Sequence, residues 1–208
     1  MKKTNIFLYV LESLADWEVG YLTAELNSKR FASYPEKFSD IIKISKSLDS
    51  ITTMGGMKIK PDKIYTDIEF QSGDLLILPG SNNRDDNMEI IDLAQNLLNN
   101  GVIVAGICGA TIALSKVGIL NKYSHTSNDK NLLKMISSNY CGDDKYKDKP
   151  SVCHNNLITA SGLAPLEFTY EILQKINYMK PQVLHNWYQL YSTRDGKYYM
   201  DLIESMSN

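Results

Sequence analysis

The chain has 208 residues, of which 43% are apolar and 22% are charged, and its formal net charge is −2. A chain of this length can bury its own hydrophobic core as a single domain, spanning residues 1–208. Proteins that bind nucleic acids or membrane surfaces usually concentrate basic charge, so this composition predicts neither kind of partner.

The first expected element is a strand over residues 4–11, a nearly continuous apolar run typical of a parallel strand buried on both faces. Together with the basic start, this run is similar to a short signal peptide. However, Glu12 and Asp16 interrupt the apolar run, and no small-residue cleavage site follows. No stretch approaches the roughly 18 apolar residues that span a bilayer. We therefore expect a buried strand in a cytoplasmic protein.

The next segments alternate between helix and strand patterns. Asp16 is placed to cap a helix whose apolar side is formed by Val19, Leu22 and Leu26. Residues 41–44 then predict a second, shorter strand. Residues 54–57 read as a glycine turn with short strands on either side.

The middle of the chain carries the clearest patterns. Residues 74–78 predict a third buried strand, which stops at Pro79-Gly80. Residues 88–99 repeat apolar positions with helical spacing, and Gly101 ends that helix. A fourth buried strand over residues 102–105 runs directly into residues 106–110, after which another helix begins.

The C-terminal part continues the alternation. We expect a strand over residues 157–159 and a helix from Pro165 to about Ile176, because proline suits the first helical position. A polar loop is expected over residues 141–149, and a helical extension rich in aromatic residues at about 181–206. Alternating strands and helices predict an α/β fold, a doubly wound, mostly parallel sheet with helices on both faces in a three-layer sandwich.

Ligands of such sheets bind outside the carboxyl ends of the strands. Three segments leave strand ends here, at residues 12–18, 79–83 and 106–109. The third is a strand-to-helix turn in which Gly106 and Gly109 flank Cys108, as in a nucleophile elbow. The positive end of the following helix would favour a thiolate and lower the pKa of Cys108. The alternative is a buried structural cysteine beside a glycine turn.

The cysteines also indicate the compartment. Cys108, Cys141 and Cys153 form an odd set in which no pair has metal-ligand spacing. We therefore expect reduced thiols, as in a cytoplasm.

The sequence also carries no motif for a bound metal or cofactor. The three histidines lack zinc-site spacing, and the glycine motifs that bind dinucleotides or ATP phosphates are absent. The sequence thus predicts no metal and no cofactor.

Residues 102–111 resemble the cysteine elbow of the ThiJ/PfpI superfamily, the flavodoxin-like group related to the Parkinson-associated protein and the PfpI proteases. Four further segments resemble blocks of that family in the same order, at residues 15–18, 74–81, 125–128 and 156–162. The resemblance covers about residues 4–176 and is strongest to a bacterial branch that is often labelled glutamine amidotransferase-like. It implies a flavodoxin-like fold and a homodimer, and it is a weaker guide to the substrate.

The resemblance also implies roles for individual residues. Glu18 would be a protonated carboxyl that donates a hydrogen bond to the Cys108 sulfur, because a second negative charge beside a thiolate raises the pKa of the acid. His125 would act as a general base or pair with the thiolate. Independently of the resemblance, acyl or hemithioacetal chemistry at Cys108 would require donors to an oxyanion, and backbone N–H groups at Gly109 and in the Gly80-Ser81 loop are the candidates, with ordinary turn glycines as the alternative. The alternatives are a solvated first-turn Glu18 and a polar loop His125.

Several positions depart from the family pattern. Many members carry a histidine directly after the cysteine, where this chain has Gly109-Ala110-Thr111. Class I glutamine amidotransferases carry a downstream His-x-Glu, whereas this chain has Ala164 in the place of the histidine, so glutaminase activity is not expected. We expect His154 at the surface and His185 in packing or an interface.

Three functions remain open. The first is a cysteine-dependent enzyme acting on a small molecule, either an amidase or other C–N hydrolase or a glyoxalase-like enzyme, with Cys108 as nucleophile. The second is a stress-responsive or redox-responsive protein in which Cys108 is an oxidation sensor. The third is a binding module without activity, whose thiol would keep an ordinary pKa of about 8.5.

Overall fold

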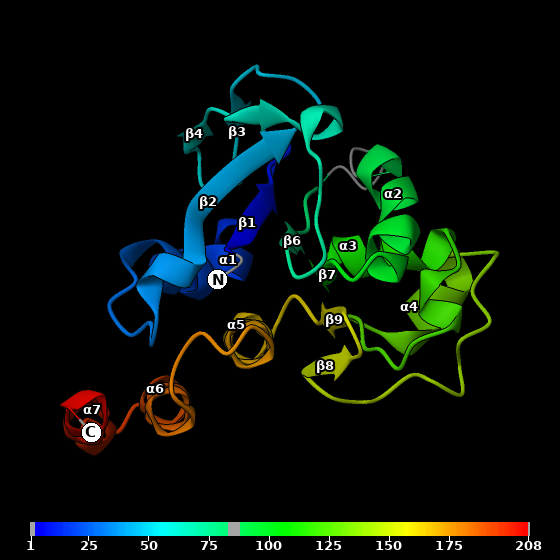
Figure 1. Ribbon diagram of the computed structural model, residues 1–208. Coiled ribbons are helices and arrows are strands. Elements are labelled where there is room, and N and C mark those ends of the chain that lie inside the picture. Colours follow the sequence, from blue (N-terminus) through cyan, green and yellow to red (C-terminus); the bar gives the residue numbers. More distant parts are fainter. Residues whose placement is uncertain (1–2, 83–87, 208) are drawn as a thin grey trace.

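The computed structural model describes residues 3–82 and 88–207. Its centre is a seven-stranded sheet in the order β5-β2-β1-β6-β7-β9-β8 (Figure 1). β8 pairs antiparallel with β9, and the other pairs in this sheet are parallel. The strands are β1 (Thr4–Tyr9), β2 (Phe38–Ser45), β5 (Lys63–Ile64), β6 (Leu75–Leu78), β7 (Ile103–Ile107), β8 (Ser151–His154) and β9 (Leu157–Ala160).

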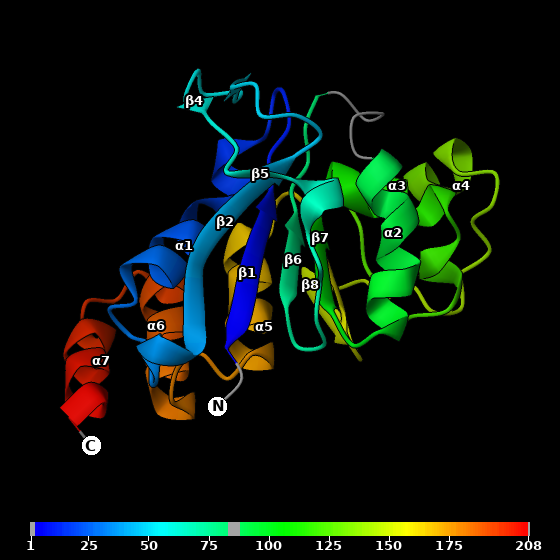
Figure 2. The ribbon, with the colours of Figure 1, turned by 45° about the horizontal axis from the view of Figure 1, so that its top comes forward.

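Helices cover both faces of this sheet and make three layers (Figures 1 and 2). One face carries α1 (Asp16–Ser28), α5 (Pro165–Lys175) and α6 (Pro181–Thr193). The other face carries α2 (Met88–Asn99), α3 (Gly109–Lys116) and α4 (Lys130–Ile136). The predicted doubly wound α/β class is therefore confirmed.

The central strands explain why this sheet forms. β6 is buried along its whole length, and β1 is buried over its last four residues. Such runs need cover on both faces, which the two helical layers provide. α2 begins and ends where its helical spacing predicted. β2 extends beyond the predicted residues 41–44 at both ends. Three further elements, β5, β8 and α4, were not among the predicted strands and helices.

A small antiparallel hairpin of β3 (Ile51–Thr52) and β4 (Lys58–Ile59) lies around the predicted glycine turn. The expected capping role of Asp16 is wrong, because Ala15 is the N-cap of α1 and no side chain caps it. The Asp16 carboxylate instead accepts the Gly55 N–H at 2.6 Å. This bond ties the hairpin to the first turn of α1.

The strand order places the chemistry-bearing loops together. The chain moves outward from β1 to β2 and β5, then returns to the other side of β1 at β6. Ligands of doubly wound sheets bind where the order reverses in this way. The loops after β1, β6 and β7 therefore meet at one edge.

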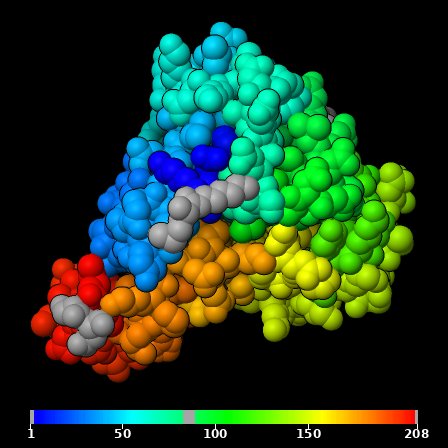
Figure 3. Space-filling model, in the orientation of Figure 1, coloured from blue at the N-terminus to red at the C-terminus, as the bar shows by residue number. Residues whose placement is uncertain are grey.

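The helices after Pro181 pack at a corner of the molecule. α7 (Lys197–Ser207) packs against α6 and projects beyond the sheet (Figures 2 and 3). α6 is anchored by Trp187, which is fully buried and donates a hydrogen bond from Nε1 to the Glu25 carboxylate of α1 at 3.0 Å. Arg30 pairs with the same carboxylate, also through Nε at 3.0 Å. The buried Glu25 carboxylate therefore joins α1, the helix that carries Glu18, to the C-terminal helices.

Within residues 3–82 and 88–207, no helix has the length and apolar character needed to cross a membrane.

Replacing Trp187 with Phe removes the donor to the buried Glu25 carboxylate and keeps an aromatic ring in place. Hydrogen bonds to charged groups contribute about 1.5–3 kcal/mol, so we expect Trp187→Phe to lower the free energy of unfolding by about that amount. Urea denaturation measures it. Tyr199→Phe, at an exposed position of α7, is the matched control and should change stability by less than about 0.5 kcal/mol. Equal effects of the two variants would show that the Trp187 bond contributes no net stability.

Candidate active site

Cys108 occupies the sharp turn that the sequence predicted between β7 and α3. Its backbone has φ 56° and ψ −119°, a conformation that side-chain-bearing residues rarely adopt and that costs about 1–3 kcal/mol. Gly106 keeps the turn tight, since a Cβ there would lie 2.9 Å from Leu114 Cδ1. The half-buried thiol stands at the N-terminus of α3.

Glu18 lies in the first turn of α1 and is only 1% exposed. Its Oε2 accepts the Gly80 N–H at 2.6 Å, and Oε1 is buried with no hydrogen-bond partner among the described residues. Burial is the main reason that the pKa of Glu18 is raised. Gly80 permits this approach, because a Cβ there would lie 3.0 Å from both carboxylate oxygens and from the Gly109 nitrogen. The solvated first-turn alternative for Glu18 does not fit this position.

The thiol and the carboxyl are electrostatically coupled. Burial first, and then an ionised Glu18 carboxylate, raise the pKa of Cys108 to about 11, which is opposite to the lowering expected from the helix terminus. The Asn128 amide and the Gly109 N–H act in the other direction. We infer that the pair holds one proton near neutral pH, because two like charges cannot share this buried space. Glu18 and Cys108 also share a side-chain hydrogen bond, so a proton on the carboxyl removes the repulsion and makes Glu18 the donor in that bond.

Asn128 is the residue that sequence reasoning missed. Its Nδ2 donates to Cys108 Sγ at 3.2 Å, and its Oδ1 accepts the Gly162 N–H at 2.7 Å. A backbone N–H can only donate, so this contact fixes the amide orientation and directs the NH₂ group at the sulfur. The sequence did contain one indication of this role, because Asn128 lies in the segment 125–128, which resembles a block of the ThiJ/PfpI family.

His125 is not brought to the thiol. Its ring is fully buried, with Nδ1 2.8 Å from the Tyr123 carbonyl and Nε2 2.8 Å from the Tyr140 hydroxyl. Burial lowers the pKa of His125, which favours the neutral ring. Both nitrogens are engaged away from Cys108, so the expected role as its base or ion-pair partner does not fit this position. His125 also forms only an isolated bridge with Tyr146 rather than ending a strand.

The other two histidines lie away from the thiol as well. His154 is half-buried on β8, and its Nδ1 accepts the Ser124 N–H at 2.9 Å, so it is not the free surface residue that was expected. His185 is exposed on α6, so it does not pack within the chain, and a role in an interface remains a prediction.

The expected oxyanion donors are only partly retained. The Gly80 N–H is already given to Glu18, so it is not available to a bound oxygen. Ser81 forms a bridge with Leu14 and lines the cleft above the thiol. The Gly109 N–H lies in the first turn of α3 and has no partner within the helix, and its bond to the Cys108 sulfur weakens when the sulfur loses its negative charge on attacking a carbonyl. Gly109 therefore remains the best-placed donor for a developing negative charge.

The thiol opens into a cleft of about 340 Å³. Its lining is mostly neutral and consists of Trp17, Glu18, Met54, Ser81, Asn82, Cys108, Gly109, Ile112, Asn128 and Leu132. A larger groove of about 620 Å³ runs between α1, β2 and the hairpin, and Cys108 does not line it. In the described part of the chain, no group of three histidine, cysteine or acidic side chains is arranged to hold a metal ion.

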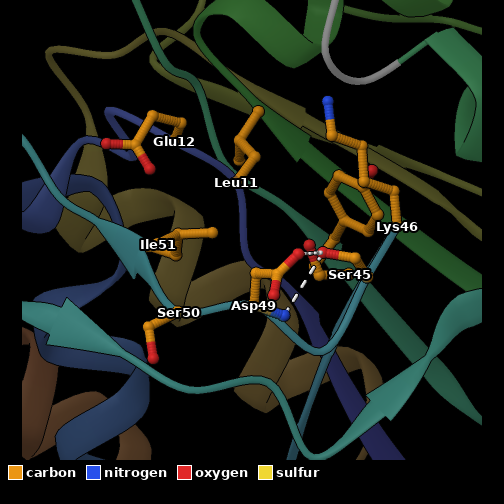
Figure 4. Close-up of a pocket in the computed structure, with 9 residues that line it drawn as sticks. Leu11, Glu12, Ser45, Lys46, Asp49, Ser50 and Ile51 are labelled. Carbon is orange, nitrogen blue, oxygen red and sulfur yellow. Dashed lines mark hydrogen bonds between the residues drawn. The ribbon is translucent and has the colours of Figure 1, made fainter.

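A further hollow of about 220 Å³ lies at the carboxyl ends of β1 and β2 (Figure 4). Its acidic groups are engaged within the chain: Glu12 Oε2 accepts the Thr52 N–H at 3.0 Å, and Asp49 Oδ2 accepts the Ser47 hydroxyl at 3.0 Å. It therefore shares an edge of the sheet with the thiol cleft but contains no residue that contacts the sulfur.

Comparison with known proteins matches most of the chain to one family. The model of the DJ-1/PfpI family matches residues 4–175. The chain is 39% identical to the Bacillus subtilis protein named uncharacterized protease YoaZ, and the alignment covers 100% of both chains. It is 33% identical to the B. subtilis protein named uncharacterized protease YdeA, over 96% of this chain and 94% of that one. A crystal structure of a thiJ/pfpI family protein from Bacillus anthracis superposes with a TM-score of 0.96 at 41% identity, covering 100% of this chain and 99% of that one.

Replacing Glu18 tests the shared proton. Glu18→Gln keeps an oxygen for the Gly80 N–H and an NH₂ donor for the sulfur, whereas Glu18→Leu removes both. A hydrogen bond to a charged group corresponds to roughly one to two pKa units, so we expect the thiol pKa of the Leu variant to exceed that of the Gln variant by this amount. The rate of iodoacetamide alkylation of Cys108, which rises with pH through the thiol pKa, measures it. A wild-type pKa above those of both variants would show that Glu18 is ionised and only repels the thiolate.

Gly162 tests the space around the sulfur. A Cβ at this position would lie 2.7 Å from Cys108 Sγ and 2.9 Å from its Cβ, so Gly162→Ala must displace the thiol. We expect Cys108 alkylation to slow at least tenfold. Gly20→Ala is the control, because nothing lies within 4 Å of its added Cβ, and alanine stabilises a helix by up to about 1 kcal/mol relative to glycine. Unchanged alkylation of the Gly162 variant would mean that the sulfur occupies another position.

Proposed function

This chain belongs to the DJ-1/PfpI family, and we propose that it is a cysteine-dependent hydrolase that cleaves an acyl C–N bond of a small molecule. The supporting observation is the pairing of Cys108 with a buried Glu18 carboxyl at a cleft of about 340 Å³. A cleft of this size suits a small ligand. The names of YoaZ and YdeA, both called proteases, favour a hydrolytic reaction.

In the first half of the proposed reaction, the Cys108 thiolate attacks the carbonyl carbon and forms a C–S bond. The carbonyl electron pair moves to the oxygen, which the Gly109 N–H stabilises. Protonated Glu18 gives its proton to the leaving nitrogen, the C–N bond breaks, and the amine departs. The products of this half are a thioester on Cys108 and an ionised Glu18.

In the second half, ionised Glu18 takes a proton from a water molecule whose oxygen attacks the thioester carbon. The tetrahedral adduct collapses, the C–S bond breaks, and the acid leaves. Cys108 is again a thiolate and Glu18 again carries its proton, so one water is consumed in each cycle. The Asn128 NH₂ group orients the attacking thiolate in the first half and stabilises the departing thiolate in the second.

A second candidate function, an oxidation sensor, is favoured by the same donors. The sulfur lines an open cleft beside the Asn128 NH₂ group and the Gly109 N–H. These groups would also hold the oxygens of a sulfinic acid. The homodimer and the cytoplasmic location expected above remain predictions under either function.

The nucleophile is tested by Cys108→Ser. We expect it to lower turnover of neutral amides and p-nitrophenyl esters by roughly a thousandfold or more, because a serine hydroxyl ionises far less readily than a thiol and is a much weaker nucleophile. The thermal unfolding curve should be unchanged. Intact mass spectrometry of the wild-type protein should detect the acyl adduct. Cys153→Ser, at an exposed position of β8, should retain turnover. Retained turnover in the Cys108 variant would exclude Cys108 as the nucleophile.

The same substrate panel separates the alternatives. Turnover of small aldehydes without hydrolysis of amides or esters would replace the hydrolase with a glyoxalase-like enzyme. Absence of all turnover, combined with oxidation of Cys108 by mild peroxide ahead of Cys141 and Cys153, would replace it with the sensor.

A further inference from the structure

We propose that Trp17 determines the specificity of the thiol cleft, and that the cleft selects neutral carbonyl compounds carrying an aromatic or branched aliphatic group. This inference rests on the proposed nucleophilic role of Cys108 and adds the chemical class of the substrate. It is carried by the position of the indole ring, the exposed apolar residues of the cleft lining, and the charges that line the cleft.

Trp17 exposes a large apolar surface next to the reacting atom. Its side chain is 53% exposed, although aromatic residues of this size are usually mostly buried. The ring is nevertheless held in place, because Nε1 donates a hydrogen bond to the Gly162 carbonyl at 3.3 Å. An aromatic ring that is exposed and also immobilised offers a contact surface with little loss of entropy on binding.

Gly162 connects the indole to the sulfur. The same residue that accepts the Trp17 hydrogen bond lies so close to Cys108 that a Cβ on it would be 2.7 Å from Sγ. Trp17 is also the direct neighbour of Glu18 in the first turn of α1. A substituent on the carbon under attack is therefore within reach of the indole ring.

Met54 is a second exposed apolar residue of the cleft lining, and its backbone is fixed. It lies at the tip of the hairpin and is 36% exposed. Its N–H donates to the Leu14 carbonyl at 2.9 Å, and the adjacent Gly55 N–H donates to Asp16 at 2.6 Å. The hairpin thus holds the Met54 backbone at the cleft, so that its side chain lines the cleft together with Trp17.

The charges around the cleft disfavour anionic substrates. Among its described lining residues there is no lysine, arginine or histidine, and Glu18 is the only carboxyl. A substrate carboxylate would therefore find no counter-ion among these described residues and would enter beside a thiolate. Asn82 and Asn128 provide neutral amides instead. This combination fits an uncharged substrate with a polar carbonyl and an apolar side group.

The experiment compares three alkylating probes on the full chain: iodoacetamide, N-benzyl iodoacetamide and iodoacetate. The rate at Cys108 is measured by peptide mass spectrometry and divided by the rate with N-acetylcysteine, which removes intrinsic reactivity. The same thiolate attacks the CH₂ carbon of both amides and displaces iodide, so the ratio of their rates does not depend on the thiol pKa. We expect the normalised rate with the benzyl reagent to exceed that with iodoacetamide about tenfold, as one aromatic contact of about 1.4 kcal/mol predicts. The normalised rate with iodoacetate should be at least tenfold lower than that with iodoacetamide.

Variants assign the preference to the indole. Trp17→Ala should abolish the tenfold benzyl preference, and Trp17→Phe should keep part of it. Tyr34→Ala, which removes an aromatic side chain of the same 53% exposure outside the cleft lining, should leave the ratio unchanged. An unaltered ratio in Trp17→Ala, or iodoacetate as fast as iodoacetamide, would overturn the inference.

Two further outcomes separate it from the proposed function. If Cys108 reacts with both amides at equal normalised rates, the specificity assignment fails while the nucleophile stands. If Cys108 reacts with none of the probes, the proposed function fails first. A lower molar mass of Trp17→Ala in light scattering, with an unchanged probe ratio, would make the indole a contact between copies and also overturn the assignment.

Discussion

The site depends on the burial of one carboxyl group between the loops that follow β1 and β6. Glu18 is almost inaccessible, and within the described part of the chain the Gly80 N–H is the one backbone donor to its carboxyl. A buried ionised carboxylate with so few donors is costly, and a neighbouring thiolate increases that cost. Both costs disappear when the carboxyl carries a proton and shares it with Cys108. The loop at Gly80 leaves room for the Glu18 carboxyl, and the strained turn at Cys108 places the thiol beside it, so both backbone features allow the two groups to share one proton.

The parts of the fold that the sequence revealed are those in which burial leaves a strong pattern. β1, β6 and β7 are continuous apolar runs, and the glycines around Cys108 mark the turn at the end of β7. The order of these strands then places Glu18, Gly80 and Cys108 at one edge. By contrast, β5 contains two residues and α4 contains seven, which is too few for a periodic signal. Their positions are set by tertiary contacts that no local pattern records.

The segment 125–128 supplies the third partner of the thiol through Asn128 and not through His125. A histidine in a segment near a reactive cysteine predicts a base or an ion-pair partner. The segment from 125 to 128 does reach the thiol, but His125 turns into the interior against Tyr140. Asp129 caps α4 by accepting the Leu132 N–H, and this places Asn128 at the entry to the helix, facing Cys108 and Gly162. Which of four consecutive side chains faces the sulfur depends on this local backbone path.

An amide in that position limits the chemistry that the cleft can perform. Asn128 orients and stabilises a thiolate, but it neither releases nor accepts a proton at neutral pH. Apart from Cys108 itself, Glu18 is then the only titratable side chain among the described residues that line the cleft. One carboxyl must therefore act first as acid and later as base. Acyl transfer to sulfur followed by hydrolysis has this requirement, since the leaving nitrogen takes one proton and the attacking water returns one. The neutral lining and the single shared proton thus favour the same reaction class, hydrolysis of an uncharged acyl compound.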